Sequence, residues 1–214
     1  SGLKMLTIIG RAIVSRKQTL ATFRSDNLQA TLFSVHDVIV KMIQAQKETT
    51  EVRCNAYDAL CSLSGVLCIP QSTAAADVCA GIRDDKTDVR ARACIFATSY
   101  VESAKDVESF SKVVLPELCK SLNDASNENE KDALVVALLA LAHRSKKHFS
   151  ENYREIANGL KKVISEDEAT KTYAVLRAKA MSCLALLGIL HFFPLPQHLF
   201  HVFPSILICE QIFV

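Results

Sequence analysis

The chain has 214 residues, of which 50% are hydrophobic and 22% are charged, so it is long enough to bury a substantial core as one domain. Six glycines and five prolines are too few for the many turns of a β-sandwich or an α/β enzyme. The formal net charge of +2 gives no indication of binding to nucleic acid or to a membrane surface. Composition therefore favours an all-α protein with short joints.

Apolar residues at helical spacing predict a series of helices separated by polar joints. In chain order, the predicted helices cover residues 3–14, 26–46, 51–67, 72–82, 88–104, 106–124, 127–144, 150–165 and 170–190. Thr49 or Thr50 can cap the third helix, and Ser126 or Asn127 can cap the seventh. Pro70 ends the third helix, because a proline cannot continue the backbone hydrogen-bond ladder.

Pairs of these helices alternate with polar joints, which indicates a helical repeat. Aligned first-helix positions fall at Val52, Val89, Lys131 and Leu176, at intervals of 37, 42 and 45 residues. Such intervals are typical of HEAT or armadillo units and exceed those of ankyrin or tetratricopeptide repeats. One hairpin cannot bury its apolar face alone, so neighbouring hairpins stack and leave a concave and a convex surface. We predict an all-α, HEAT/armadillo-like α-solenoid of about four to five helical hairpins, forming one domain over residues 3–190.

Two segments resemble the first helix of a HEAT unit. They are TEVRCNAYDALCSLSG and TDVRARACIFA, and each has an arginine, Arg53 or Arg90, directly after a valine in its first turn. The segment VVLPELCKSLNDASNENEKDA resembles a HEAT hairpin joint. An arginine at that place can bond to the acidic joint of a neighbouring repeat, which would create a ladder of charged pairs along the stack.

Residues 130–189 show a narrower resemblance, to the middle HEAT repeats of importin-β-type nuclear transport receptors (karyopherin-β, importin-5-like). The matching positions are Phe149, Tyr153, Leu160, Lys161, Leu176, Arg177, Lys179, Cys183 and Gly188. The resemblance implies a central fragment of a nuclear import receptor, which binds protein cargo and FG nucleoporins and shuttles between cytoplasm and nucleus. In the full-length receptor it implies cargo release by the Ran GTPase, which the family grips through N-terminal repeats that such a fragment would lack.

The alternative is another HEAT-repeat scaffold subunit, either phosphatase-regulatory or translation-associated. The unequal repeat intervals favour the transport receptor, whose repeats diverge, over a phosphatase scaffold with nearly uniform units. Ser1-Gly2 resembles the remnant of a removed tag, so we expect the chain to be a piece of a longer protein.

The second helix of each hairpin lines the concave face of a HEAT stack, so its polar side is the candidate partner-binding surface. In residues 108–122 the predicted apolar side comprises Phe110, Val113, Val114, Leu118 and Leu122, and in residues 151–164 it comprises Tyr153, Ile156, Leu160, Val163 and Ile164. The opposite sides give the candidate partner-binding residues, which are Lys112, Lys120, Arg154, Asn158 and Lys161. This stripe is basic, which argues against a basic localisation signal as its partner and leaves two alternatives, an acidic partner or another part of the same receptor.

No motif indicates catalysis, a cofactor or a metal. The sequence has no Gly-rich phosphate loop, no GxSxG, no HExxH and no CxxC pair. Cys54, Cys61 and Cys68 recur every seven residues, on one face of the predicted helix 51–67 and its continuation. Together with Cys94, Cys119 and Cys183 they are predicted to be reduced core thiols, so we expect no enzyme activity and no bound cofactor or metal.

Residues 191–214 form an atypical apolar tail, rich in proline and phenylalanine. Its prolines leave no run long enough for a membrane-spanning helix, so no membrane insertion is expected. Its histidines, His191, His198 and His201, lack a further ligand at suitable spacing, which argues against a metal site. Either the tail is foreign to the helical stack, or it folds back as a cap over the apolar end of the last hairpin.

Overall fold

The computed structural model describes residues 26–45, 48–166 and 171–192, and within them the chain forms only helices and their joints. The helices are α2 (Asp26–Gln44), α3 (Thr50–Ser64), α4 (Gln71–Ile82), α5 (Thr87–Ser103), α6 (Glu108–Asp124), α7 (Glu128–Arg144), α8 (Lys146–Glu151), α9 (Tyr153–Ser165) and α10 (Lys171–Phe192). The all-α prediction is confirmed for these residues. The helix expected over residues 3–14 and the tail beyond Phe192 lie outside the described part of the chain.

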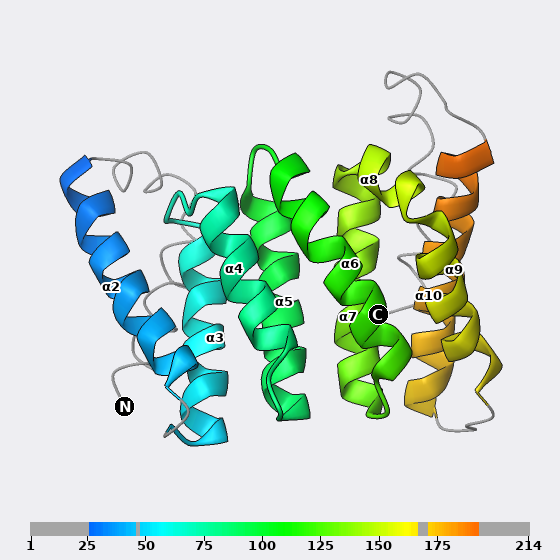
Figure 1. Ribbon diagram of the computed structural model, residues 1–214, viewed down its shortest axis with the longest axis horizontal. Helices are drawn as coiled ribbons and strands as arrows, with labels where there is room; N and C mark the ends of the chain where they lie inside the picture. The colour runs from blue at the N-terminus through cyan, green and yellow to red at the C-terminus, as the bar shows by residue number, and fades with distance from the viewer. Residues whose placement is uncertain (1–25, 46–47, 167–170, 193–214) are drawn as a thin grey trace.

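The helices form two layers that extend side by side along the long axis of the molecule (Figure 1). The first layer contains α3, α5, α7 and α10, each packed against the next, and the second contains α2, α4, α6 and α9. Each second-layer helix also packs on the first-layer helix that follows it in the chain, as α4 does on α5 and α6 on α7. The short helix α8 contacts α6, α7 and α10.

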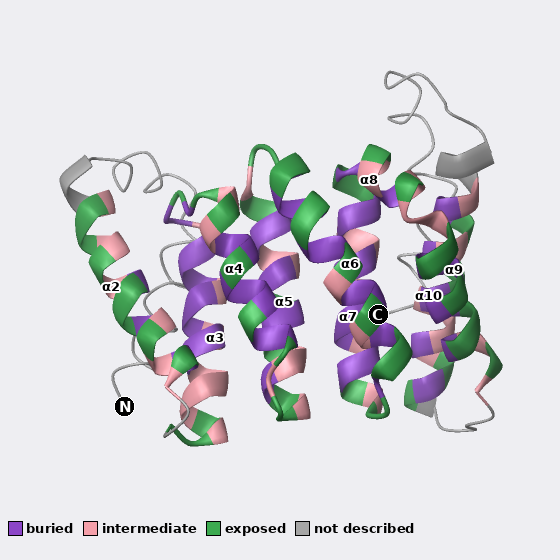
Figure 2. Cartoon of the chain, in the orientation of Figure 1, coloured by how far each residue is buried: buried purple, intermediate pink, exposed green. Residues whose placement is uncertain are grey.

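Buried residues lie mainly where the two layers face each other, and exposed residues occupy the outer surfaces (Figure 2). A row of aromatic rings, Tyr57, Phe96, Tyr100 and Phe110, crosses the core from α3 through α5 to α6, with successive centroids 6.3, 6.4 and 4.8 Å apart. Burying each such ring contributes about 2 to 3 kcal/mol. The core is therefore shared between neighbouring helix pairs.

Side-chain caps fix where two first-layer helices begin, as the sequence predicts. The Thr49 hydroxyl accepts a hydrogen bond from the Val52 N–H at 3.3 Å, at the start of α3. The Asn127 side-chain oxygen accepts from the N–H groups of Asn129 and Glu130, at 2.9 and 3.3 Å, at the start of α7. Each bond satisfies a donor that the helix itself leaves unpaired.

Three predictions about the elements are wrong. The helix expected over residues 150–165 begins only at Tyr153, as α9, and a separate short helix that was not predicted, α8, precedes it over Lys146–Glu151. The helix expected to reach residue 67 ends at Ser64, so Cys68 lies exposed in the joint and is not a core thiol. Val113, predicted to face inward from α6, is 52% exposed, while Cys119 is 3% exposed. The helix α6 packs against both α4 and α9, so a wide side of it is buried. The middle of this buried side lies at a different angle around the helix from the apolar side that the sequence predicts.

A ladder of charged pairs joins successive helix pairs. Arg53 of α3 forms an ion pair with Asp84 in the joint between α4 and α5. Arg90 of α5 donates one hydrogen bond to the Asp84 carbonyl at 2.9 Å and two to the carboxylate of Glu130 on α7. Arg53 therefore pairs with the acidic joint as the sequence predicts, whereas the carboxylate partner of Arg90 is Glu130, inside the next first-layer helix and not in a joint.

The ladder has a second part farther along the stack. Lys131 of α7 forms an ion pair with Glu166, which follows α9, and Glu166 also accepts a hydrogen bond from the Tyr173 hydroxyl of α10. Burial favours the neutral carboxyl of Glu166, but these two donors outweigh that effect and lower its pKa. The carboxylate is thereby held charged between the last two helix pairs.

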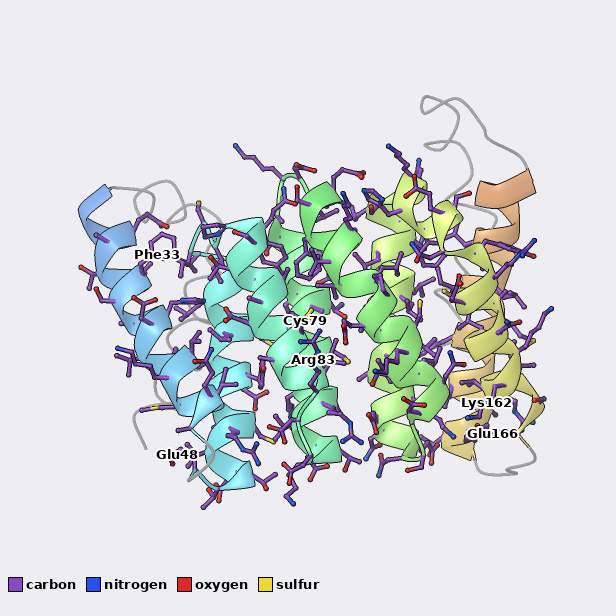
Figure 3. All side chains as sticks on the ribbon, viewed as in Figure 1. Phe33, Glu48, Cys79, Arg83, Lys162 and Glu166 are labelled. Carbon is purple, nitrogen blue, oxygen red and sulfur yellow. The ribbon has the colours of Figure 1, made fainter. Side chains whose placement is uncertain are left out.

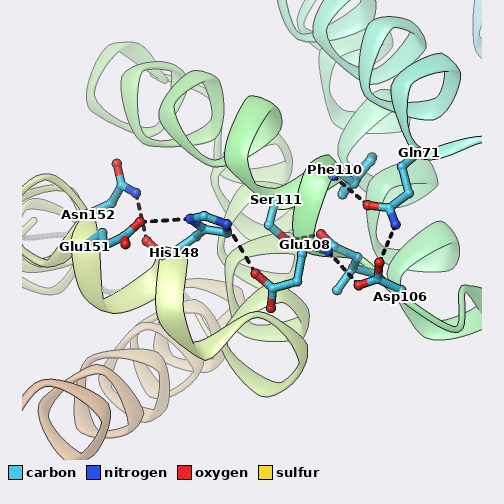
Figure 4. Close-up of polar contacts among 9 residues, drawn as sticks. Gln71, Asp106, Glu108, Phe110, Ser111, His148, Glu151 and Asn152 are labelled. Carbon is cyan, nitrogen blue, oxygen red and sulfur yellow. Dashed lines mark hydrogen bonds and ion pairs between the residues drawn. The ribbon is translucent and has the colours of Figure 1, made fainter.

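Glutamine side chains tie the second-layer helices to the joints of the neighbouring pair. Gln71, at the start of α4, donates a hydrogen bond to the Asp106 carboxylate at 2.8 Å and accepts one from the Phe110 N–H at 2.9 Å (Figure 4). Gln29 of α2 makes the equivalent pair of bonds with the Val66 carbonyl and the Cys68 N–H, both at 3.1 Å. The two glutamines thus repeat one contact along the stack.

Candidate protein-binding surface

The five candidate residues lie on two adjacent helices of the second layer. Lys112 and Lys120 belong to α6, while Arg154, Asn158 and Lys161 belong to α9, and the two helices pack against each other. All five are exposed. Within the described residues none of the five side chains makes a hydrogen bond or an ion pair. We refer to these five residues together as the α6/α9 face.

The amphipathic pattern of α9 determines which of its residues point toward solvent. Ile156, Leu160 and Val163 are each at most 1% exposed, so the opposite side of the helix must face solvent. A side chain at Gly159 would bring its Cβ to 3.0 Å from Leu122 of α6, so the glycine permits close packing of the two helices.

Other contacts hold the two helices in register at their C-terminal ends. Lys162 donates a hydrogen bond from Nζ to the Asn123 carbonyl at 2.6 Å and so satisfies an orphan carbonyl of the last turn of α6. Figure 3 shows Lys162 on α9, with Glu166 following it near the same end of the stack. Lys162 therefore has a structural task that Lys161, its neighbour in sequence, does not have.

The face is not uniformly basic. Glu155 is an exposed acidic residue of α9. Burial raises the pKa of the Cys119 thiol of α6 to about 12, and the negative charge of Glu155 adds to this effect, so Glu155 lies on the side of α9 nearest α6. Asp124 is exposed at the end of α6. Val113, 52% exposed, and Pro116, also exposed, give α6 an apolar spot between its two lysines.

A groove of about 600 Å³ adjoins the face on the other side of α6. It is lined by Ile82, Arg83, Asp84, Arg90, Glu117, Lys120, Ser121, Asp124 and Glu130. Arg83, which directly follows α4 and is labelled in Figure 3, bridges the groove by donating to both carboxylate oxygens of Glu117, at 3.2 and 2.6 Å. The hydrogen bonds from Arg83 are the main cause that lowers the pKa of Glu117, and the nearby charge of Lys120, at the rim of the groove, adds a smaller effect without forming an ion pair in the described residues.

Sequence reasoning missed Arg83 and Glu117, which are separated by 34 residues. Neither residue belongs to a motif. Only the packing of α4 against α6 brings the two side chains together, so no local pattern could have identified them.

The segment that joins α7 to α9 carries several basic residues, among them Arg144 and His148, and is part of the scaffold. The His148 ring contacts Glu108 of α6 through Nε2 at 3.2 Å and Glu151 of α8 through Nδ1 at 2.8 Å (Figure 4). Arg144 donates to the carbonyls of Ala104 and Lys105 at the end of α5. The His148 contacts hold α8 on the start of α6, and the Arg144 bonds hold the end of α7 on the end of α5, which accounts for both residues without a ligand.

The described residues contain no group of three or more histidine, cysteine or acidic side chains that could hold a metal ion. Asp84 and Asp85, the acidic pair of the α4–α5 joint, contact Arg53. Among the described helices, none has the length and apolarity needed to cross a membrane. His198 and His201 lie outside the described residues.

Comparison of the chain with known protein families, with curated proteins and with solved structures finds no match.

Proposed function

We propose that the chain is a protein-binding scaffold of HEAT-like helical hairpins. The observation that carries this proposal is the two-layered stack itself, whose second layer leaves the α6/α9 face exposed and its charged side chains unpaired. The first-layer helices begin at Thr50, Thr87, Glu128 and Lys171, at intervals of 37, 41 and 43 residues, which is the interval of HEAT and armadillo units. A stack of this kind offers a long continuous surface on which affinity is spread over several units.

We further propose that the scaffold is a fragment of an importin-β-type nuclear import receptor. This rests on the resemblance of residues 130–189 to the middle repeats of that family. The ladder contacts of Arg53 and Arg90 support helical repeats in general, and they favour no single family. On this proposal the chain binds cargo and FG nucleoporins and moves between cytoplasm and nucleus.

The test is direct binding of the purified chain to an FG-repeat nucleoporin segment, measured by biolayer interferometry. The matched control is the same segment with every Phe of its FG repeats changed to Ser. We expect binding to the FG segment and none to the control. Equal signals from both segments would exclude the import-receptor proposal.

A negative FG result would leave the scaffold proposal open, and a second measurement then addresses it. The chain would be titrated with a purified phosphatase catalytic subunit and with ribosomal subunits. Saturable binding to either one would move the assignment to the corresponding scaffold class. Absence of binding to all of these partners would count against the proposed classes of scaffold.

A further inference from the structure

We propose that the α6/α9 face binds an acidic protein segment whose carboxylates flank an apolar side chain. The inference rests on the proposed scaffold function, since it names the chemistry of the partner at one surface of that scaffold. It is drawn from the position, exposure and lack of partners of the charged residues on α6 and α9.

Helix geometry fixes the spacing of the four cations. Lys112 and Lys120 are eight residues apart on α6, about 12 Å along the helix, and Arg154 and Lys161 are seven residues apart on α9, about 10 Å. Packed helices have axes about 8 to 10 Å apart. The contacts of His148 with Glu108 and of Lys162 with Asn123 set α6 and α9 side by side in the same direction, so Lys112 lies at one end of the face and Lys161 about 16 Å farther along it. The four cations are therefore staggered along a strip that one extended segment of a partner can cover.

Folding does not account for these cations. Arg53, Arg90 and Lys131 each bond a carboxylate of a neighbouring helix or joint, and each is largely buried. The four cations of the face are exposed, and the described residues give them no such partner. They remain available for an anionic group from another molecule, and charged rim residues of this kind set the partner and the rate of association.

The chemistry of the face favours a protein segment over a nucleic acid. Val113 and Pro116 are exposed between Lys112 and Lys120, and they can contact an apolar side chain of the partner. Glu155 and Asp124 interrupt the positive potential, and a continuous phosphate backbone would be repelled where it passes them. A protein segment can place its carboxylates against the cations and leave neutral or basic residues beside Glu155 and Asp124.

The test uses a fluorescein-labelled 14-residue peptide with Glu at every third or fourth position and Leu at its centre. A second peptide replaces each Glu with Gln. Binding is followed by fluorescence anisotropy at 50 and 300 mM NaCl. We expect the Glu peptide to bind at low salt and the Gln peptide to bind at least about tenfold more weakly. Binding of the Glu peptide should weaken at high salt, because exposed charge pairs are screened.

Matched variants then localise the binding. The test variant combines Lys112→Gln, Lys120→Gln and Lys161→Gln, and the control variant combines three other exposed lysines, Lys41→Gln, Lys105→Gln and Lys147→Gln. Both lose the same charge. The structure gives none of the six ammonium groups a partner in the described residues, so both variants should fold, which circular dichroism would verify.

We expect the test variant to bind the Glu peptide about tenfold more weakly and the control to bind it within twofold of the parent chain. An equal loss in both variants would show attraction by net charge alone and overturn the proposal. Tighter binding of a 14-nucleotide single-stranded RNA than of the Glu peptide would also overturn it. Binding to FG repeats without binding to the Glu peptide would support the proposed function and contradict this inference.

Discussion

Arg90 and Glu130 form a buried, two-bond ion pair between α5 and α7. Arg90 donates from Nε and Nη2 to the two carboxylate oxygens of Glu130, at 2.5 and 3.0 Å. The Glu130 side chain is 1% exposed and that of Arg90 is 21% exposed. Because a carboxylate so deeply buried needs a charged partner, the pair makes the stability of α7 depend on a residue of α5.

We expect Arg90→Met to lower the free energy of unfolding by about 3 kcal/mol, since it leaves the Glu130 carboxylate buried and unpaired. Urea denaturation followed by circular dichroism measures the change. The matched control is Arg92→Met, two residues later on α5. Arg92 pairs with Asp58 at 3.1 Å but is 45% exposed, so its loss should cost less than about 1 kcal/mol. Equal losses would show that burial of Glu130 does not set the strength of the pair.

Gly81 permits the close approach of α3, α4 and α5. A Cβ at this position would lie 2.1 Å from the Tyr57 hydroxyl and 2.4 Å from the Ala93 Cβ. We expect Gly81→Ala to lower the free energy of unfolding by about 2 kcal/mol, because both neighbours are fully buried and have no free space.

Gly188 provides the control for this substitution. A Cβ there meets no atom within 4 Å, so Gly188→Ala should be neutral or stabilise α10 by up to about 1 kcal/mol through helix propensity. Thermal unfolding of both variants distinguishes the two cases. A Gly81 variant as stable as the parent chain would mean that the helices separate easily at this contact.

Most of the helix pattern could be predicted from sequence because local signals determine it. Thr49 and Asn127 supply caps, and the apolar side of α9 repeats at helical spacing. The division between α8 and α9 could not be predicted, because Asn152 stands there without a glycine or proline to mark it. The exposure of Val113 depends on the helices on both sides of α6, which no local pattern contains.

The candidate surface could be predicted only in part. Exposure of Lys112, Lys120, Arg154, Asn158 and Lys161 follows from the amphipathic patterns of their helices and is observed. Their role in binding stays a prediction. The groove bridged by Arg83 and Glu117 could not be predicted, because it depends on side chains brought together by packing from residues 34 positions apart.

The buried pair of His36 and Asp77 joins α2 to α4. The His36 Nε2 lies 3.0 Å from an Asp77 carboxylate oxygen, and the two side chains are 2% and 5% exposed. Asp37 approaches the other ring nitrogen at 3.6 Å, and the Phe33 ring packs edge-on against the imidazole. The hydrogen bond to Asp77 is the main cause that raises the pKa of His36 above its ordinary value of 6.5, against the opposing effect of burial.

A raised pKa stabilises the fold only while the imidazole is protonated. The contribution of His36 is therefore complete below pH 6.5 and is lost as the pH rises through the raised value. We expect the difference in unfolding free energy between the parent chain and His36→Gln to shrink between pH 6 and pH 9. Urea titrations at several pH values measure it. A difference that stays constant or grows over this range would contradict the prediction.

Native thiol labelling should separate Cys68 from the buried cysteines. Cys68 is exposed in the joint between α3 and α4, whereas Cys119 and Cys183 are buried, and burial raises the pKa of each of those two thiols to about 12. Iodoacetamide reacts with the thiolate and must reach it, so at pH 7.5 we expect Cys68 to be alkylated at least about a hundredfold faster. Mass spectrometry of the digested chain gives the rate at each cysteine. Unfolding in urea should abolish the difference, and its absence in the native chain would show that the helices around Cys119 and Cys183 open readily.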